Sequence, residues 1–228
     1  ASSSAAMMGG ILSNNSSGME AGVEHNSYHT LRSIKFMLAN GHIYDSGVAA
    51  DRKRFEADEP DLCRGLMEIR RRILSDDAMR EKIVRKYRIK NVTGYAMNSF
   101  VDFDTPMDIF AHVLIGSEGT LAYIISGELA TLPLYYVYSS ALLYFPDVTS
   151  AAAAAAPLGE KGALAVEMMD YASLVSYMGK RPDLPAGTTA MLVDFGASTP
   201  DEMAQRVAEL TPQFKALPSL SRMEPFTT

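Results

Sequence analysis

Two segments rich in glycine, serine and asparagine are the parts of this chain best suited to contact a ligand. Residues 9–18 read Gly-Gly-Ile-Leu-Ser-Asn-Asn-Ser-Ser-Gly, and residues 116–120 read Gly-Ser-Glu-Gly-Thr. Glycine lets the backbone bend tightly and approach a bound group closely, and neighbouring backbone N–H groups can bind phosphate oxygens. Asn14 and Asn15 can donate further hydrogen bonds from their side chains. Taken alone, either segment is better explained by a simple turn.

Several other kinds of chemical site are excluded by the sequence. Neither segment has the spaced glycines of the dinucleotide fingerprint or the Lys-Ser/Thr ending of a P-loop, and Gly-x-Ser-x-Gly does not occur. Cys63 is the only cysteine, which excludes internal disulfides and cysteine-rich metal sites and favours a reducing compartment. No metal site is expected, because the histidines lack a zinc-like spacing. These are His25, His29, His42 and His112.

Composition indicates a folded protein of 228 residues, with 47% hydrophobic and 21% charged residues. No apolar run reaches the roughly 18–20 residues of a membrane-spanning helix, and residues 1–6 do not read as a signal peptide. A net charge of −6 argues against nucleic acid as the main partner. We therefore expect a cytoplasmic protein.

One stretch runs against the acidic character of the chain. Residues 64–90 hold ten Lys or Arg against four Asp or Glu. Solvated helix faces explain such a run. The alternative is a basic patch that meets an anionic membrane surface or an acidic electron acceptor, which would place the protein at the periphery of the inner membrane.

A hairpin and a charged loop are expected between the two glycine-rich segments. Residues 31–38 have strand character, and Asn40-Gly41 fits the central pair of a type I′ turn. Residues 42–44 would form the second strand of the hairpin. Residues 52–61 read as a loop. Residues 9–18 themselves hold too few large side chains for a core helix or a plain strand.

Helices are expected next. Ser75 is a plausible N-cap for a helix to about residue 86, and Thr105 with Pro106 starts another that ends near residue 114. Before them, an apolar stripe at helical spacing predicts a further helix. Its members are Leu62, Leu66, Ile69 and Ile73.

The pattern of predicted elements changes in the last part of the chain. Strands are expected at residues 121–132 and 137–145, and residues 146–210 then alternate helix, strand, helix, strand and helix. The expected caps of the first and last of these helices are Asp147 or Thr149, and Thr199. No closing element is evident in residues 219–228. We expect the domain boundary near Phe145.

Taken together and in order, the motifs resemble the vanillyl-alcohol-oxidase, or PCMH-type, FAD-binding domain. They are residues 9–18, Asn-Ser-Tyr-His-Thr-Leu at 26–31, Asn-Val-Thr-Gly-Tyr at 91–95, and Ile-Gly-Ser-Glu-Gly-Thr-Leu-Ala-Tyr-Ile at 115–124. Gly-Ser-Glu-Gly-Thr-Leu is the most specific of them. The chain is most similar to the branch that holds D-lactate dehydrogenases, the glycolate oxidase FAD subunit and 2-hydroxyglutarate dehydrogenases.

The resemblance implies an α+β fold in two parts. Residues 1–145 would be the second subdomain of the FAD-binding domain, and residues 146–228 the start of an α/β, ferredoxin-like cap domain. The first FAD subdomain would precede residue 1, and the histidine-containing metal motif of the cap would follow residue 228. The chain would therefore be a fragment that contributes FAD binding and is inactive by itself, with the catalytic residues elsewhere.

The resemblance also implies which residues meet the cofactor. FAD would be bound by Gly9, Gly10, Asn14, Asn15, Ser16, Gly18, Gly116, Glu118, Gly119 and the backbone near Ile124. Glu118 has an alternative role, in which its carboxylate caps nearby backbone N–H groups. Tyr95 and Asn98 would face the flavin or the substrate, with core packing or a turn as the alternative.

The activity implied for the parent protein is oxidation of a 2-hydroxy acid of the D-lactate or glycolate type to the 2-oxo acid. FAD would take the electrons and pass them to a quinone, a cytochrome or a flavoprotein. The alternative is a non-catalytic α/β interaction module that has lost the cofactor. It is favoured by Ala122, which stands where the family normally has glycine, a change that matters if the position needs a positive φ.

Overall fold

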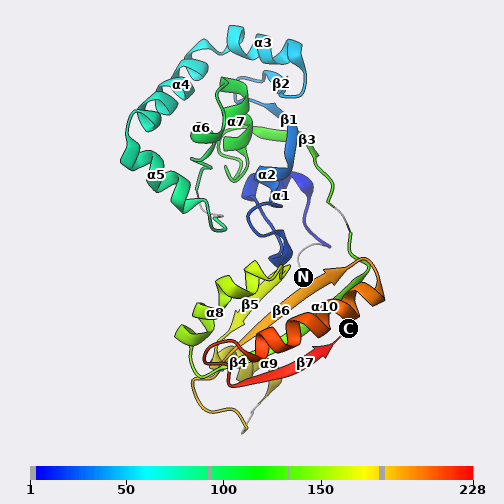
Figure 1. Ribbon diagram of the computed structural model, residues 1–228. Helices are drawn as coiled ribbons and strands as arrows, with labels where there is room; N and C mark the ends of the chain where they lie inside the picture. The colour runs from blue at the N-terminus through cyan, green and yellow to red at the C-terminus, as the bar shows by residue number, and fades with distance from the viewer. Residues whose placement is uncertain (1–3, 92–93, 133, 180–182, 228) are drawn as a thin grey trace. The chain divides into compact units, whose positions relative to one another are not determined.

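A computed structural model describes residues 4–91, 94–132, 134–179 and 183–227. The chain divides into two compact units, Ala1–Leu132 and Pro133–Thr228. We expected the boundary near Phe145. It falls earlier because strand β4 (Val137–Phe145) pairs with two strands of the second unit. Figure 1 shows the elements of both units.

The first unit contains a three-stranded antiparallel sheet and a set of helices. The strands are β1 (Leu31–Met37), β2 (Ile43–Asp45) and β3 (Tyr123–Leu129), in the order β2-β1-β3. The helices are α1 (Met8–Asn14), the 3-10 helix η1 (Met19–Ala21), α2 (Ser27–Thr30), α3 (Ala49–Asp58), α4 (Pro60–Leu74), α5 (Asp77–Lys86), α6 (Ser99–Asp102) and α7 (Pro106–Leu114). In Figure 1, α3, α4 and α5 follow one another in an arc around α6 and α7.

The core of this unit lies between α7 and the sheet. Phe36 of β1 packs against Phe110 of α7 and Phe55 of α3, and the side chains of Phe36 and Phe55 are fully buried. Aromatic rings that pack edge-on or tilted against each other stabilise a core beyond the area that they bury. Both glycine-rich segments are attached to this core, the first through Leu12 and the second through Leu114.

The predicted hairpin is confirmed, but its turn type is wrong. Gly41 N–H donates to Leu38 O at 2.9 Å, and the N–H of Leu38 donates to His42 O at 2.9 Å. Gly41 has a φ of +87°, whereas Asn40 is not among the residues with positive φ. A type I′ turn needs a positive φ at both central residues. The connection is therefore a three-residue loop with glycine in the left-handed position.

Two predicted loops are in fact helical. Residues 9–14 belong to the short helix α1, which inserts only Leu12 into the core. Residues 52–58 belong to α3, whose single buried side chain is Phe55. A helix with one buried residue per three turns has no apolar periodicity, so the sequence pattern cannot indicate it.

The other helices of this unit are close to their predictions. Thr105 caps α7 as expected, accepting from Asp108 N–H at 3.2 Å. Helix α5 is capped by Asp76 and not by Ser75. In α4, Leu66 and Ile73 of the predicted stripe are buried, Leu62 is partly buried, and Ile69 is 40% exposed.

In its described residues, the second unit is a four-stranded antiparallel sheet with three helices. Its elements follow β4 in the order α8 (Val148–Glu160), β5 (Ala165–Met169), α9 (Tyr171–Met178), β6 (Thr189–Ala197), α10 (Pro200–Lys215) and β7 (Arg222–Thr227). The sheet order is β5-β6-β4-β7. This is the ferredoxin-like arrangement of two interleaved βαβ units, as predicted.

Both faces of this sheet carry helices. Leu158 of α8 and Phe214 of α10 pack with Phe195 of β6 in one cluster, and Leu174 of α9 packs with Tyr144 of β4 in another. Strand β7 was not predicted, because no closing element is visible in residues 219–228. It forms only by pairing with β4. Across the described residues of both units, no helix is long and apolar enough to cross a membrane.

Candidate cofactor-binding site

The two glycine-rich segments lie against each other in the first unit. Gly116 N–H donates to Leu12 O at 3.1 Å, and Glu118 N–H donates to Ser13 O at 2.8 Å. The side chains add a bond from Asn14 Nδ2 to Glu118 Oε1 at 2.6 Å. The carboxylate of Glu118 thus holds the partner segment. Segments about a hundred residues apart in sequence form one structural element.

The second segment is a tight loop because three of its residues have left-handed backbone angles. The φ values are +88° at Gly116, +55° at Glu118 and +71° at Gly119. A Cβ atom added at Gly116 would stand 3.6 Å from the Cβ atom of Asn15. Ala122 is not among the residues with positive φ, and its side chain is buried in the core. The alanine at this position therefore disturbs nothing in the loop.

A groove runs between α1 and β3, with a volume of about 450 Å³. Gly9 and Gly10 form one wall, and no atom lies within 4 Å of where a side chain at Gly10 would begin. The opposite wall is β3, an edge strand whose outer backbone groups are free to pair. The groove lining is Met7, Met8, Gly9, Gly10, Leu12, Ser13, Gly119, Ala122, Tyr123, Ile124, Ile125, Ser126 and Gly127.

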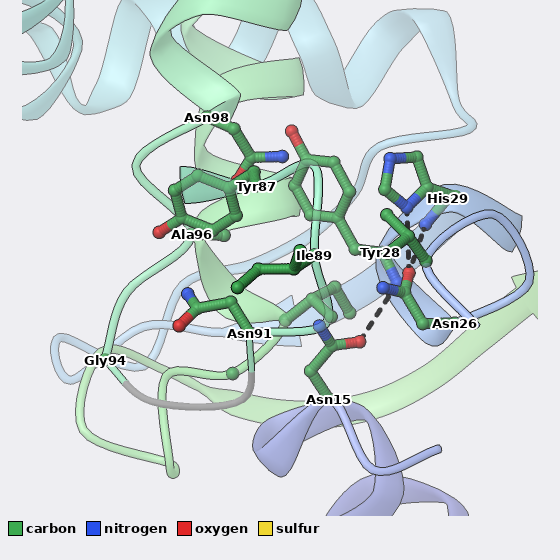
Figure 2. A pocket seen from close by; sticks show the side chains of 13 residues that line it. Asn15, Asn26, Tyr28, His29, Tyr87, Ile89, Asn91, Gly94, Ala96 and Asn98 are labelled. Carbon is green, nitrogen blue, oxygen red and sulfur yellow. Dashed lines mark hydrogen bonds between the residues drawn. The ribbon is translucent and has the colours of Figure 1, made fainter. Parts of the chain in front are cut away.

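A smaller pocket opens next to the same two segments, and we call it the asparagine pocket (Figure 2). Asn15 and Gly116 form part of its wall, and Asn98 lies at the opposite end. Its volume is about 20 Å³. The other lining residues are Val23, Asn26, Tyr28, His29, Tyr87, Ile89, Asn91, Gly94, Ala96 and Ile115.

The predicted site residues therefore fall into two groups. Four of them line the α1–β3 groove and three line the asparagine pocket. The groove group is Gly9, Gly10, Gly119 and Ile124, and the pocket group is Asn15, Gly116 and Asn98. Asn14 and Glu118 line neither cavity, and their side chains form a hydrogen bond with each other.

The remaining predicted residues line neither cavity. Ser16 Oγ donates to Asn14 Oδ1 at 2.6 Å and supports that side chain. Tyr95 is 44% exposed, and its hydroxyl bonds Thr120 Oγ1 at 2.9 Å, so it ties down the second segment. Gly18 O accepts from Lys90 Nζ at 3.3 Å.

Lys90 is a site residue that the sequence interpretation missed. Its Nζ also donates to Ser17 O at 2.8 Å, which brings a positive charge to the end of the first segment. The only signal in the sequence was its place in the basic run. Other members of that run bond to groups of the same unit. Arg71 pairs with Glu68, and Arg70 Nε donates to Phe103 O.

Four buried side-chain atoms in the described residues have no hydrogen-bond partner, and all of them belong to the first unit. They are Ser17 Oγ, Asn98 Oδ1, Ser99 Oγ and Ser117 Oγ. Two of these hydroxyls belong to the glycine-rich segments. Buried polar atoms without partners are few in folded proteins, and a binding partner is one explanation for them.

A titratable cluster lies behind the asparagine pocket. Tyr28 Oη donates to Asp102 Oδ2 at 2.8 Å, and burial together with this carboxylate raises the pKa of Tyr28. Burial lowers the pKa of His112, whose ring stacks on Phe103 at 3.8 Å. No group of three potential metal ligands occurs in the part of the chain that the structure describes.

Comparison with known proteins gives a likeness of fold. No protein-family model and no curated protein matches the sequence. Two solved structures of alkyldihydroxyacetonephosphate synthase are similar, from crystals in P1 and in P212121. The first is 11% identical and matches 90% of this chain and 33% of the synthase with a TM-score of 0.49; for the second the values are 10%, 93%, 32% and 0.53.

The fold class is confirmed. The second likeness shows a shared fold over 93% of this chain, a mixed arrangement of helices and antiparallel sheets. The chain spans about a third of the length of the structures it matches. At 10% identity the likeness concerns the fold, so the role of each site residue depends on the geometry given above.

Proposed function

We propose that the first unit of this chain binds FAD between its two glycine-rich segments and strand β3. The observation that carries the proposal is the joining of the segments, through Gly116 N–H to Leu12 O and Glu118 N–H to Ser13 O. This joining places bare glycines beside the open edge of a strand. The fold likeness to the second synthase structure is compatible with this proposal.

The residues present fit such a group. Gly10 has no side chain in the groove, and Gly119 N–H has no partner among the described residues and can serve a phosphate or ring oxygen. Lys90 at the end of the first segment favours a negatively charged cofactor. When bound, FAD supplies an electron-accepting ring, and the protein holds and orients it.

For the longer protein we propose oxidation of a 2-hydroxy acid to a 2-oxo acid, with a quinone, cytochrome or flavoprotein as the electron acceptor. This proposal is supported by the motif resemblance, most specifically by Gly-Ser-Glu-Gly-Thr-Leu at residues 116–121. The matched structures are named as a synthase, and that name implies a reaction other than the oxidation of a 2-hydroxy acid. The alternative of an interaction module without cofactor loses the support of Ala122, because the backbone at this position has no positive φ.

The test is titration of the chain with FAD, followed by flavin fluorescence. Gly10→Leu would fill the groove with a side chain, whereas Gly65→Leu places the same side chain on the exposed face of α4. Both glycines have open space around the new Cβ atom, so the two changes begin from matched positions. We expect Gly10→Leu to weaken FAD binding by about tenfold or more and Gly65→Leu to leave it unchanged. Absence of saturable binding, or equal binding by the two variants, contradicts the proposal.

A further inference from the structure

Two asparagine side chains in the asparagine pocket have orientations fixed by the backbone. Asn15 Oδ1 accepts from Tyr28 N–H at 3.3 Å, and Asn26 Oδ1 accepts from His29 N–H at 3.0 Å. A backbone N–H can only donate, so the atom that it meets must be the amide oxygen. The NH2 group of each side chain is therefore the other end of the amide.

These NH2 groups are held in the wall of the pocket without a partner. Asn15 and Asn26 are each 7% exposed, and both line the pocket. In Figure 2 the two amide nitrogens point towards the space beside Ile89, while dashed bonds hold the two oxygens on the other side. Within the described ranges, neither nitrogen has a hydrogen-bond acceptor. Two donors from different segments thus meet at one small space.

The surroundings restrict what these donors can bind. The volume of about 20 Å³ admits a group the size of one water molecule or one oxygen atom. The described lining contains no Asp, Glu, Lys or Arg, and Ile89, Ala96 and Ile115 supply apolar walls. Neutral amide donors in such a setting suit a carbonyl or carboxylate oxygen. A phosphate would call for arginine or lysine.

We propose that Asn15 and Asn26 form a donor pair that binds a carbonyl or carboxylate oxygen of a ligand. The pair deepens the proposed function and rests on it, because Asn15 belongs to the segment assigned to FAD. Two sources can bring such an oxygen to the pocket. One is a ring carbonyl of the flavin, and the other is the carboxylate of a small hydroxy acid.

Asn→Asp substitutions test the pair with little change in shape. Asn26→Asp keeps an oxygen for His29 N–H, and Asn15→Asp keeps one for Tyr28 N–H, but each replaces the donating NH2 with a negatively charged oxygen. Aspartate also tolerates the left-handed φ of +53° at Asn15. The control is Asn40→Asp, in the exposed hairpin loop, where an oxygen for His42 N–H is likewise kept and the NH2 that is lost donates to Glu59 Oε1, away from the pocket.

Two probes distinguish the sources of the oxygen. FAD is titrated with detection by fluorescence, and D-lactate is titrated with detection of the side-chain NH2 resonances of Asn15 and Asn26 by 15N–1H NMR. We expect each pocket variant to weaken one of the two by about tenfold or more, and Asn40→Asp to weaken neither. Loss of FAD binding identifies the flavin carbonyl, and loss of the lactate response identifies the carboxylate.

The outcomes separate this proposal from the one before it. If FAD binds the native chain and both pocket variants equally, and lactate moves neither NH2 resonance, the donor pair is overturned while FAD binding stands. If FAD does not bind at all but lactate moves both resonances, the pair stands and the FAD site falls. Circular dichroism will show whether Asn15→Asp folds. If it does not, Asn26→Asp alone tests the proposal, because this substitution changes only the side-chain NH2 group into an oxygen.

Discussion

The two units differ in how closely they follow the usual rules of a folded protein. In the second unit, β4 and β6 pair over nine consecutive residues without a register shift, and the pairing of β4 with β7 is interrupted once. In the first, the pairing of β1 with β3 is interrupted twice, and the first unit holds every buried polar atom that lacks a partner among the described residues. Asn15 and Glu118 also lie there, and they are two of the three non-glycine residues with positive φ in the described ranges. Departures of this kind concentrate where a protein binds ligands.

If the two units have separate cores, the largest mutational effect should stay within one of them. Phe195 of β6 is fully buried and packs against Phe214 and Phe226, so Phe195→Ala should lower the free energy of unfolding of the second unit by about 3–5 kcal/mol. Hydrogen exchange followed by mass spectrometry would locate the effect. Equal loss of protection in residues 1–132 would show that the cores are coupled, against the comparison.

A smaller effect is expected from the ion pair that holds α3 to α7 in the first unit. Arg52 donates to both carboxylate oxygens of Asp108, and each side chain is about one third exposed. Removing the cation by Arg52→Leu should cost about 1–3 kcal/mol at neutral pH, as urea unfolding would measure. Arg54→Leu is the control, because Arg54 pairs with carboxylates only on the surface of α3.

The cost of Arg52→Leu should fall in acid. Burial acts to raise the pKa of Asp108, but hydrogen bonds from Arg52 and Thr105 outweigh it, and the pKa lies below its ordinary value of 3.8. The stability that the pair contributes is therefore present above about pH 4 and is lost as the pH falls through the lowered pKa. A cost that is unchanged at low pH would mean that packing, and not charge, holds α3.

How far the sequence predicts this fold depends on whether an element carries its own signal. Strand β4 alternates and is flanked by Pro146, and α7 has the cap Thr105, so both were predicted closely. Helix α3 was missed because a partner 56 residues away, Asp108, holds it in place. Strand β7 contains Pro225 and exists through pairing with β4. Tertiary contacts decide such elements, and a local pattern cannot show them.

The candidate site shows the same division. The glycine-rich segments could be found from composition, although only their order along the chain with the other motifs favoured a ligand over a simple turn. Asn26 was visible only as part of a motif. Its role as a donor depends on which end of its amide meets His29 N–H, and Lys90 reaches the first segment across 72 residues. The sequence alone indicates neither the orientation of the Asn26 amide nor the contact of Lys90 with the first segment.

The loop conformation of the first unit predicts an effect of intermediate size. Gly116→Ala would force alanine to a φ of +88° beside Asn15, at a cost of about 1–2 kcal/mol in thermal or urea unfolding. Gly65→Ala is the matched control, because Gly65 lies in the exposed face of α4 with open space around it, and alanine there should stabilise by about 0.5–1 kcal/mol. Equal effects of the two changes would show that the positive φ at Gly116 does not require glycine.

The smallest effect concerns His112, which titrates inside the first unit. Its Nδ1 bonds Asp108 O at 2.8 Å, its ring stacks on Phe103, and burial lowers its pKa below the ordinary value of 6.5. The unfolded chain therefore binds a proton more readily than the folded one. Stability is full above about pH 7 and declines as the pH falls through 6.5 towards the lowered pKa.

Replacing this ring isolates its contribution. His112→Phe keeps an aromatic ring against Phe103 and Tyr28 but cannot be protonated. We expect the variant to lose part of the decline in unfolding free energy between pH 7 and pH 5, measured by urea titration at each pH, while Asp108 acts only in more acidic solution. An identical pH profile would exclude His112 as its source. If the decline belongs to His112, acid should loosen residues 1–132 before the second unit, which sharpens the difference between the two.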